Sequence, residues 1–370
     1  MTDKTIRKAL HIVWIGASFV AYPLLTALSK RGDTKNILCM PQLSRIGDIV
    51  CSTPVFYNIK KFYPDSKLTV LISKKALGIV KNNPRIDNFI IVEDYSFFGL
   101  IKKLRSERFT WSINLTATSI NTCLSLWASI PNRVKTIVET PPITERLTDW
   151  MSNHRLLYKN HTYLPQHHTR LLSFMGIQNP EDKKEVWTTA LSEEKVNAWK
   201  KGFAKKKIIG ISITAGNKIK ELGDDRFEIL IKKLIEIPNV IVCCIGSPAD
   251  NTRIDALVSK ISSPLFIKAT HFTLEELPAL MKSFSLYIAV DTGPIYIAHA
   301  LGVPLIDIIG PVDPTEQPPQ DEKSIQILPH GNIQPSSFVF KKRGTPDEIQ
   351  SALQATSIEE IFAASVKMIS

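Results

Sequence analysis

The sequence predicts an α/β protein with two consecutive domains, each built on a parallel β-sheet. Short apolar segments of strand character alternate with helical segments from Asn36 to Val138, and the same alternation returns from Lys207 to Ile309. A polar run, Gln178 to Glu185, separates the two series. The predicted parts are domains at residues 34–177 and 207–345, a linker region at 178–206 and a C-terminal helical segment at 346–370.

The composition is that of a folded globular chain with a basic surface. At 370 residues, with 44% hydrophobic and 22% charged residues, the chain is long enough for two domains of ordinary size. The formal net charge of +11 favours anionic partners, namely nucleotides, phosphorylated glycolipids or an acidic membrane surface. Nucleic acid suits this charge equally, but no basic segment interleaves with aromatic residues and no RNA-binding signature occurs. We therefore predict no nucleic-acid partner.

An apolar run from Ala9 to Leu28 is the first element. As a helix it would be roughly 30 Å long, which matches a bilayer core, although Gly16, Ser18 and Pro23 make it a mediocre span. A membrane span, a helix lying in the interface, and a core helix or signal peptide all remain open. We treat residues 1–33 as an N-terminal apolar helix and possible membrane anchor. Basic residues flank the run on both sides, at Lys4, Arg7, Lys8, Lys30, Arg31 and Lys35.

The elements of the first domain follow from hydrophobic periodicity. Apolar runs bounded by polar residues predict strands at 37–41, 67–73, 89–92, 110–115 and 134–138. Helical spacing predicts helices at 49–63, 75–81, 97–105 and 120–128. Beyond Pro141 the pattern loosens, and only one more helix is predicted, at 164–175. Functional groups of such a domain should gather at the carboxyl ends of the strands.

The second domain repeats this architecture. Strands are predicted at 207–213, 240–246, 265–268, 286–290 and 304–309. Helices are predicted at 226–237, 248–261, 274–284 and 294–301, and a closing helix at 358–368.

Histidines and cysteines give no metal signature. The histidines at 154, 161, 167 and 168 do not have the spacing of a zinc helix or zinc knuckle, so we predict no metal site. The five cysteines also lack metal-like spacing and predict reduced, buried thiols.

The stretch from Ser285 to Pro314 carries the most specific signal. It predicts a buried strand, a turn at Asp291-Thr292-Gly293, a short helix from Pro294, and a second apolar strand. Gly293 lets the backbone approach a ligand closely, and Pro294 suits the first helical turn, where its missing N–H costs nothing. The free amides of this helix favour a diphosphate. The alternative is that Asp291 or Thr292 only caps the helix.

These motifs resemble the donor-site signature of the heptosyltransferase-like glycosyltransferases, glycosyltransferase family 9, which includes the ADP-heptose:lipopolysaccharide enzymes. The matching segments are Asp-Thr-Gly-Pro at 291–294, Ala-His-Ala-Leu-Gly-Val-Pro at 298–304 and Gly-Pro-Val-Asp-Pro at 310–314. The resemblance implies the GT-B fold, two Rossmann-like domains with a cleft between them, of which the first holds the acceptor and the second the donor. One departure is Tyr296, where the family usually has a histidine; His299 follows one turn later.

The loop from Leu43 to Asp48 contains the candidate catalytic base. Gly47 permits a tight exit from the preceding strand, and Asp48 stands at the start of the next helix. The loop resembles the family's Ser-x-x-Gly-Asp signature, which implies that Asp48 takes the proton of the attacking hydroxyl and that Ser44, Arg45 and Gly47 line the acceptor side. On the residues alone, the alternative is a first-turn aspartate that stabilises the helix dipole.

Two further loops complete the donor site that the resemblance implies. Lys220, in the polar loop from Thr214 to Glu221, matches a family lysine that contacts donor phosphate, while Leu222 replaces an aromatic residue. A lysine there would stabilise a leaving diphosphate; the alternative is a solvated surface lysine. Asp250 stands where the family has a glutamate that contacts the nucleoside. The predicted donor-binding residues are Lys220, Asp250, Asp291, Thr292, Gly293 and Pro294.

The activity implied by the resemblance is inverting, metal-independent glycosyl transfer without a cofactor. A heptose-like sugar would move from a nucleotide-diphosphate sugar, foremost ADP-heptose, to a lipopolysaccharide-core or related lipid-linked glycan. The segment from Asn114 to Ala117 departs from the family's usual Asp-Leu-His-Gly or Asp-Leu-Gln-Gly, which indicates a specialised acceptor half. Because nucleotide-sugars are made in the cytosol, we predict the cytoplasmic side of the inner membrane, with peripheral or single-span attachment, or alternatively the cytoplasm.

Two other classes of protein share a two-domain α/β layout. A non-catalytic ligand-binding protein is disfavoured by the Gly-Asp loop at 47–48 and by the lack of a convincing cleavable signal peptide. An NAD-dependent oxidoreductase would need G-x-G-x-x-G after a strand, with an acidic residue about twenty positions on. No stretch of the sequence supplies that pattern.

Overall fold

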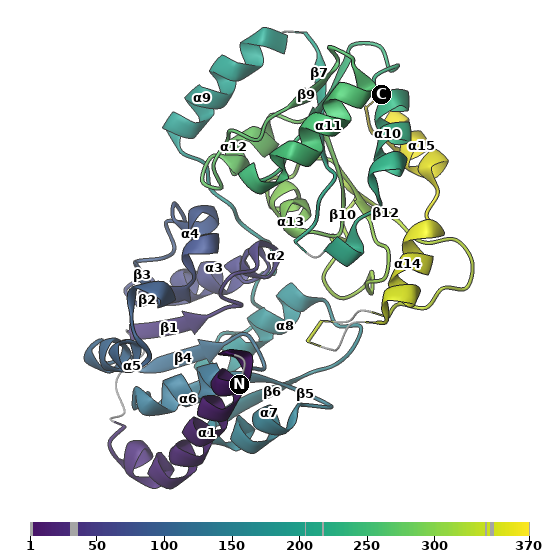
Figure 1. The fold of residues 1–370 in the computed structure, drawn as a ribbon. Helices are drawn as coiled ribbons and strands as arrows, with labels where there is room; N and C mark the ends of the chain where they lie inside the picture. Colours follow the sequence, from purple (N-terminus) through teal and green to yellow (C-terminus); the bar gives the residue numbers. More distant parts are fainter. Residues whose placement is uncertain are drawn as a thin grey trace. The chain divides into compact units, whose positions relative to one another are not determined.

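The computed structural model describes residues 3–29, 36–203, 205–216, 218–336, 339–340 and 344–369, without the side chains of 3–9 and 219. The side chains of Lys4, Arg7 and Lys8, the basic residues at 30, 31 and 35, the predicted boundary at residue 33 and Asn217 lie outside this description. The chain divides into two compact units, Met1–Leu77 with Asn83–Lys183, and Gly78–Asn82 with Lys184–Ser370 (Figure 1).

A six-stranded, wholly parallel sheet forms the N-terminal unit, in the order β3-β2-β1-β4-β5-β6. Ile37 of β1 lies opposite Leu68 of β2 and Trp111 of β4. The strands read as nearly continuous apolar runs because helices cover the sheet. Their bounds are β1 (Asn36–Met40), β2 (Lys67–Ile72), β3 (Asn88–Ile91), β4 (Trp111–Asn114), β5 (Asn132–Val138) and β6 (His154–Tyr158).

The helices that precede residue 184 pack on this sheet or on one another. Leu104 and Leu124 bury against Leu38 and Met40, so α5 and α6 cover one face. The helices are α2 (Ile46–Val50), α3 (Thr53–Phe62), α4 (Lys74–Val80), α5 (Phe97–Ser106), α6 (Ser119–Trp127), α7 (Ile143–Thr148) and α8 (Leu164–Arg170), with 3-10 turns η1 (Val92–Asp94), η2 (Asp149–Met151) and η3 (Leu171–Met175).

The apolar N-terminal segment forms one long helix, α1 (Asp3–Ala27), which lies along α6 and α7 (Figure 1). Ile15 and Leu25 bury against Cys123, Leu126 and Met151 of the N-terminal unit. By length and composition, α1 contains the one stretch of the described residues that could cross a membrane, Leu10–Ala27, with a mean hydropathy of 1.6. The helix is therefore both apolar enough for lipid and docked along one side.

The C-terminal unit holds a second six-stranded parallel sheet, in the order β12-β11-β10-β7-β8-β9. Tyr287 of β10 lies opposite Gly210 of β7 and Leu305 of β11. The strands are β7 (Lys207–Ser212), β8 (Val240–Cys244), β9 (Phe266–Lys268), β10 (Leu286–Val290), β11 (Leu305–Ile308) and β12 (Ser324–Ile327).

The core of this unit lies between the sheet and a layer made of α10, α11 and α15. Phe227 of α10 and Ile361 of α15 join Ile211, Ile288 and the other strand residues in one apolar cluster. The helices are α9 (Ala190–Lys200), α10 (Asp224–Leu234), α11 (Asn251–Ile261), α12 (Leu277–Lys282), α13 (Gly293–Ala300), α14 (Pro346–Gln354) and α15 (Ile358–Ile369), with 3-10 turns η4 (Lys201–Phe203), η5 (Lys218–Lys220) and η6 (Pro248–Asp250).

The structure confirms the predicted fold class and adds elements that the sequence did not reveal. The additions are β6, β12, α7, α9 and α14. The predicted linker region contains a helix, because α9 occupies its middle and belongs to the C-terminal unit. All five cysteines are buried thiols, as predicted.

Candidate functional site

Each sheet has one switch point, where strands on the two sides are wound in opposite directions. It lies between β1 and β4 in the N-terminal sheet and between β7 and β10 in the C-terminal sheet. Ligands of doubly wound sheets bind outside the carboxyl ends of the strands at this point. Asp48 follows β1, Lys220 follows β7 and Asp291 follows β10, so the fold brings the predicted residues to the two switch points.

Lys220 and Asp291 meet at the C-terminal switch point. Lys220 Nζ lies 2.5 Å from Asp291 Oδ2 and donates to the Asp291 carbonyl oxygen at 3.1 Å. The two side chains are only 18% and 7% exposed, so Lys220 is not the solvated surface lysine of the alternative interpretation. Tyr296 O–H donates to Asp291 Oδ1. Tyr296, which departs from the family pattern, therefore donates a hydrogen bond to the aspartate that also pairs with Lys220.

The helix α13 begins directly after this pair. Thr292 is its N-cap in extended conformation, without a side-chain capping hydrogen bond, and Pro294 occupies the first turn. The carboxylate of Asp291 is engaged by Lys220 and Tyr296 instead. The capping alternative is therefore not what the structure shows. An uncapped N-terminus beside a lysine concentrates positive charge, which suits an anionic ligand.

The loop that carries Lys220 is held by a carboxylate on its own sequence. Glu221 Oε1 accepts from the Ala215 amide at 3.1 Å, and Glu221 Oε2 accepts from Arg253 Nη1 at 2.5 Å. Arg253 also donates to Asp224, and hydrogen bonds to Asp224 and Glu221 raise the pKa of its guanidinium. Sequence reasoning missed Glu221 and Arg253, because a partner thirty-two positions away leaves no local signal.

Leu222, which replaces the family's aromatic residue, belongs to the apolar core of the C-terminal unit and is 5% exposed. Its burial anchors the end of the Lys220 loop in this core.

Asp307 is a buried carboxyl that sequence reasoning also missed. It lies within β11, opposite Ala289 of β10, and is fully buried, with neither carboxyl oxygen in a hydrogen bond. Burial, followed by the negative charge of Asp291, raises the pKa of Asp307 well above its ordinary range, and Lys220 opposes this shift. The fold therefore favours the protonated, neutral form of the Asp307 carboxyl. The sequence signal that could have found this residue is an aspartate inside the apolar run at 304–309.

Asp250 has a local partner in the structure. Its Oδ2 accepts from the Ser247 amide at 2.8 Å and from Ser247 Oγ at 2.6 Å, which closes a capping box over η6. At the neighbouring Gly246 an added Cβ would lie 2.8 Å from Ile254 Cδ1, so the Ile254 side chain would have to shift. The nucleoside contact of Asp250 stays a prediction.

Asp48 lies in the first turn of α2, at the carboxyl end of β1. Its Oδ2 is 3.9 Å from Arg45 Nη1, and the two side chains are 20% and 60% exposed. Gly47 is buried and helical, and it is not among the left-handed glycines of the described chain. The prediction that Gly47 forms the exit from the strand is therefore wrong, because the chain turns earlier, at Leu43 and the exposed Ser44.

The segment at 114–117 lies beside that loop, because the Leu115 amide donates to Met40 O at 3.1 Å. Asn114 Oδ1 accepts from Thr116 Oγ1 at 2.9 Å and from Asn121 Nδ2 at 3.1 Å. Asn114, Thr116 and Asn121 are all buried. The departure from the family pattern thus forms a self-contained amide and hydroxyl network, without the ionisable aspartate and histidine that relatives commonly have there.

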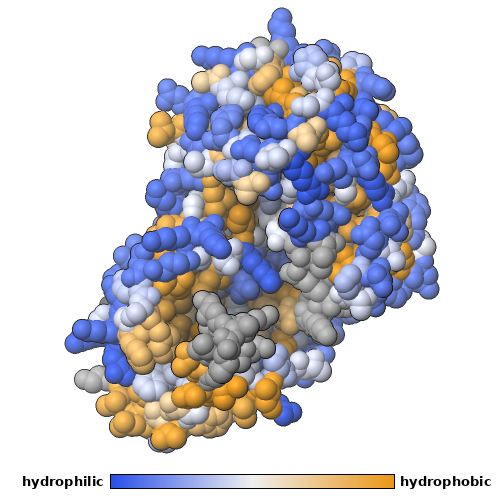
Figure 2. Space-filling view, viewed as in Figure 1, coloured by the Kyte–Doolittle hydropathy of each residue, from blue (hydrophilic) through white to orange (hydrophobic). Residues whose placement is uncertain are grey.

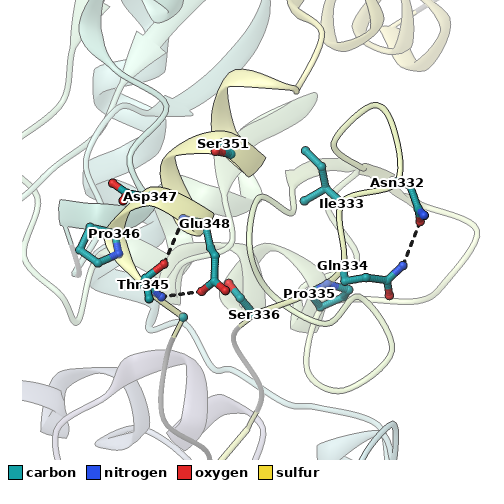
Figure 3. Close-up of a pocket in the computed structure, with 11 residues that line it drawn as sticks. Asn332, Ile333, Gln334, Pro335, Ser336, Thr345, Pro346, Asp347, Glu348 and Ser351 are labelled. Carbon is teal, nitrogen blue, oxygen red and sulfur yellow. Dashed lines mark hydrogen bonds between the residues drawn. The ribbon is translucent and has the colours of Figure 1, made fainter.

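The C-terminal unit also has an open hollow of about 1030 Å³. Figure 3 shows that its side chains pair among themselves, Thr345 with Glu348 and Gln334 with Asn332. The acidic Asp347 and Glu348 in its wall do not suit a phosphate. We assign no role to this hollow, which is lined by Asn332, Ile333, Gln334, Pro335, Ser336, Gly344, Thr345, Pro346, Asp347, Glu348 and Ser351.

The two adjacent histidines of α8 have partners in the fold. His167 Nε2 lies 3.1 Å from Thr136 Oγ1, and His168 Nδ1 lies 3.2 Å from Cys51 O. Burial lowers the pKa of His167 to about 3 and that of His168 to about 4. Within the parts of the chain that the structure describes, no group of three or more His, Cys, Asp or Glu side chains is placed to hold a metal ion.

Comparison with known proteins connects this geometry to one family. The sequence profile of glycosyltransferase family 9 (heptosyltransferase) matches residues 97–342, which include Lys220, Asp250 and the 291–294 turn but not Asp48. Lipopolysaccharide heptosyltransferase 3 of Escherichia coli K12 is 25% identical over 87% of this chain and 95% of its own length. The lipopolysaccharide core heptosyltransferase OpsX of Haemophilus influenzae is 22% identical over 76% of this chain and 81% of its own.

Solved structures show the same fold. A family 9 glycosyltransferase from Veillonella parvula superposes with a TM-score of 0.74 at 18% identity, covering 92% of this chain and 99% of its own. The E. coli ADP-heptose lipopolysaccharide heptosyltransferase II gives 0.70 at 16% identity, covering 90% and 98%. Since the profile matches well over half of the 370 residues, this chain belongs to glycosyltransferase family 9, the heptosyltransferase family, and is a glycosyltransferase.

Proposed function

We propose that this glycosyltransferase moves a heptose from ADP-heptose to a lipopolysaccharide-core or closely related glycan, with inversion and without a metal ion. The Lys220–Asp291 pair at the start of α13 carries the proposal, because it places a cation and free amides at the switch point where a nucleotide diphosphate binds. The names of the relatives support heptose and lipopolysaccharide as the substrate classes.

The transfer step assigns one role to each unit. The acceptor oxygen forms its bond to the anomeric carbon while the bond from that carbon to the diphosphate oxygen breaks. Asp48 takes the proton of the acceptor hydroxyl. Negative charge gathers on the leaving ADP, where Lys220 and the α13 amides stabilise it. Attack on the face opposite to the leaving group inverts the configuration.

Lys220 supplies the positive charge that a divalent cation supplies in other transferases, which supports the metal-independent form of the proposal. EDTA should then leave the initial rate unchanged. Loss of activity on chelation, with recovery on adding Mg²⁺ or Mn²⁺, would contradict this part.

The proposed acceptor class favours work at the cytoplasmic face of the inner membrane. Lipopolysaccharide intermediates are lipid-borne, whereas the donor is water-soluble, so the catalytic units work where both meet. The apolar helix α1 and the net charge of +11 support attachment to that surface.

A donor screen tests the proposed function. Full-length protein is incubated with ADP-heptose or with UDP- and GDP-hexoses, and nucleotide diphosphate release is followed with and without a heptose-deficient core acceptor. We expect acceptor-dependent release from ADP-heptose. Equal release from a hexose donor would contradict the sugar assignment, and tight binding without any release would favour a non-catalytic binder.

A further inference from the structure

Helix α1 is fixed to the N-terminal unit by polar as well as apolar contacts. Trp127 Nε1 donates to Ser18 Oγ at 2.8 Å, and Ser119 Oγ lies 3.2 Å from His11 Nε2. Tyr22 packs its ring against Trp150 at 4.5 Å and lies 6.0 Å from the buried guanidinium of Arg133. We call the side of α1 that makes these contacts its inner face, and it is part of the packing of the N-terminal unit.

The opposite face of α1 is apolar and exposed. Its large side chains recur every three or four positions, except for one gap of seven, so they lie along one side of the helix. They are Leu10 (63% exposed), Val13 (68%), Val20 (85%), Leu24 (64%) and Leu28 (56%), the last just past the helix end. Ile12 and Phe19 are also exposed and extend this apolar surface around the helix. We call these residues the outer face.

Exposed aromatic and aliphatic side chains continue the outer face on both flanks. On one flank Trp14 contacts Phe97 of α5, whose neighbour Phe98 is 78% exposed. On the other, Phe19 contacts Trp150 of η2, and α7, which packs against η2 and α1, adds the exposed Ile143 and Leu147. Figure 2 shows hydrophobic residues gathered along the edge of the N-terminal unit where α1 lies.

A bilayer-spanning arrangement would require α1 to leave its dock. Undocking would expose Ile15 and Leu25 and would remove the hydrogen-bond acceptor of Trp127 Nε1, whose loss costs about 1–3 kcal/mol in a buried setting. While α1 stays docked, lipid can therefore contact only one side of the apolar stretch Leu10–Ala27.

We propose that α1 lies flat in the surface of an anionic bilayer, with its inner face kept on α6 and its outer face, Phe98 and Trp150 immersed among the lipids. The inference rests on the proposed membrane-side location but not on the sugar transferred. Helices of this kind sink about 5–10 Å into the boundary between headgroups and acyl chains. Aromatic residues at the rim match the depth at which Trp and Tyr anchor membrane proteins.

Charge favours lipid over a second copy of the chain as the occupant of this face. The protein carries +11, and basic residues precede and follow the apolar run in the sequence, at Lys4, Arg7, Lys8, Lys30, Arg31 and Lys35. Two copies meeting through α1 would bring together two chains of like charge, each +11, whereas an anionic membrane attracts a cationic chain.

Vesicle flotation of the full-length protein tests the inference. We expect it to float with phosphatidylglycerol–phosphatidylcholine vesicles and to remain bound in high salt. The double variant Val20→Ser, Leu24→Ser should bind about tenfold less or weaker still, because each side chain contributes apolar burial. Leu191→Ser with Ile229→Ser, two exposed apolar residues of the C-terminal unit, is the matched control and should bind like wild type. Complete release by salt, or equal binding by both variants, would overturn the proposal.

Depth measurement distinguishes a flat helix from a spanning one. Leu10→Cys and Val20→Cys can each be labelled with a fluorophore, because the five native cysteines are buried. If the helix lies flat, lipids that carry a quencher at shallow depth should quench the fluorophore equally at the two positions. Deeper quenching at Val20 than at Leu10 would indicate a span and overturn the proposal, as would a dimer through α1 that persists with vesicles. Nucleotide release with a water-soluble acceptor fragment, measured in parallel, reports the proposed activity separately.

Discussion

At the scale of single residues, the Lys220–Asp291 pair fixes two side chains of the proposed donor site to each other. Each group neutralises the other until a diphosphate arrives and competes for the ammonium group. Truncating Lys220 removes a charge-assisted contact to phosphate and leaves Asp291 unpaired, which adds repulsion.

We therefore expect Lys220→Ala to weaken ADP binding about 10- to 100-fold, measured by calorimetry. Lys218→Ala, on the same turn but exposed, is the control and should leave binding nearly unchanged. Equal effects of the two variants would mean that overall charge, and not the pair, attracts the nucleotide.

Asp307 makes a prediction about pH. Because burial and Asp291 raise its pKa in the folded state, the folded chain keeps a proton that the unfolded chain loses above about pH 4. Folding stability from this group is full below that pH and falls as pH rises, by up to about 1.4 kcal/mol per pH unit until the folded-state pKa is reached.

Asp307→Asn abolishes this loss. Urea unfolding at pH 4.5, 6 and 7.5 should show the variant gaining on wild type as pH rises. A difference that does not change with pH, or one that turns in favour of wild type, would show that Asp307 is ionised in the folded protein.

At the scale of elements, α1 has two faces with different energetic roles. Leu25 is 4% exposed and packs in the N-terminal unit, whereas the adjacent Leu24 is 64% exposed. Leu25→Ala should lower the free energy of unfolding of that unit by about 2–4 kcal/mol, since it leaves a cavity. Leu24→Ala should change it by less than about 0.5 kcal/mol.

Thermal unfolding without lipid measures both variants. For the same reason, deleting residues 1–33 should destabilise the N-terminal unit, because it removes Ile15, Ser18 and Leu25 together. A truncated protein that melts like wild type would show that α1 is a detachable anchor.

The sequence predicts an element well when the apolar pattern of that element alone specifies it, and poorly when contacts with other elements do. The central strands β1, β7 and β10 are continuous apolar runs, and each was predicted within a residue or two. The helix α9 escaped because most of its residues are polar and only Ser192 and Val196 are buried. The docking of α1 was not predictable, since an apolar helix suits lipid and a protein partner equally.

At the scale of the whole molecule, the proposed mechanism divides one reaction between the two switch points. Asp48 and Lys220 follow the first strand of their sheets and Asp291 follows the fourth strand of its sheet, which is where a doubly wound fold presents its ligands; Asp250 follows β8 instead. Lys220 and Asp291 were therefore predictable from order and spacing. Asp307, Arg253 and the network around Asn114 were not, because they depend on contacts between strands and helices that only the folded chain brings together.

The central claim is that Asp48 is the base of a glycosyl transfer whose donor is held by the other unit. Single-turnover kinetics of Asp48→Asn with ADP-heptose and a core acceptor test it most directly, with Asp65→Asn, an exposed aspartate of the same unit, as control. We predict that Asp48→Asn slows the chemical step by about two to four orders of magnitude, while the Kd for ADP-heptose stays within about twofold of wild type. A rate within threefold of wild type, or a loss confined to donor binding, would contradict the account.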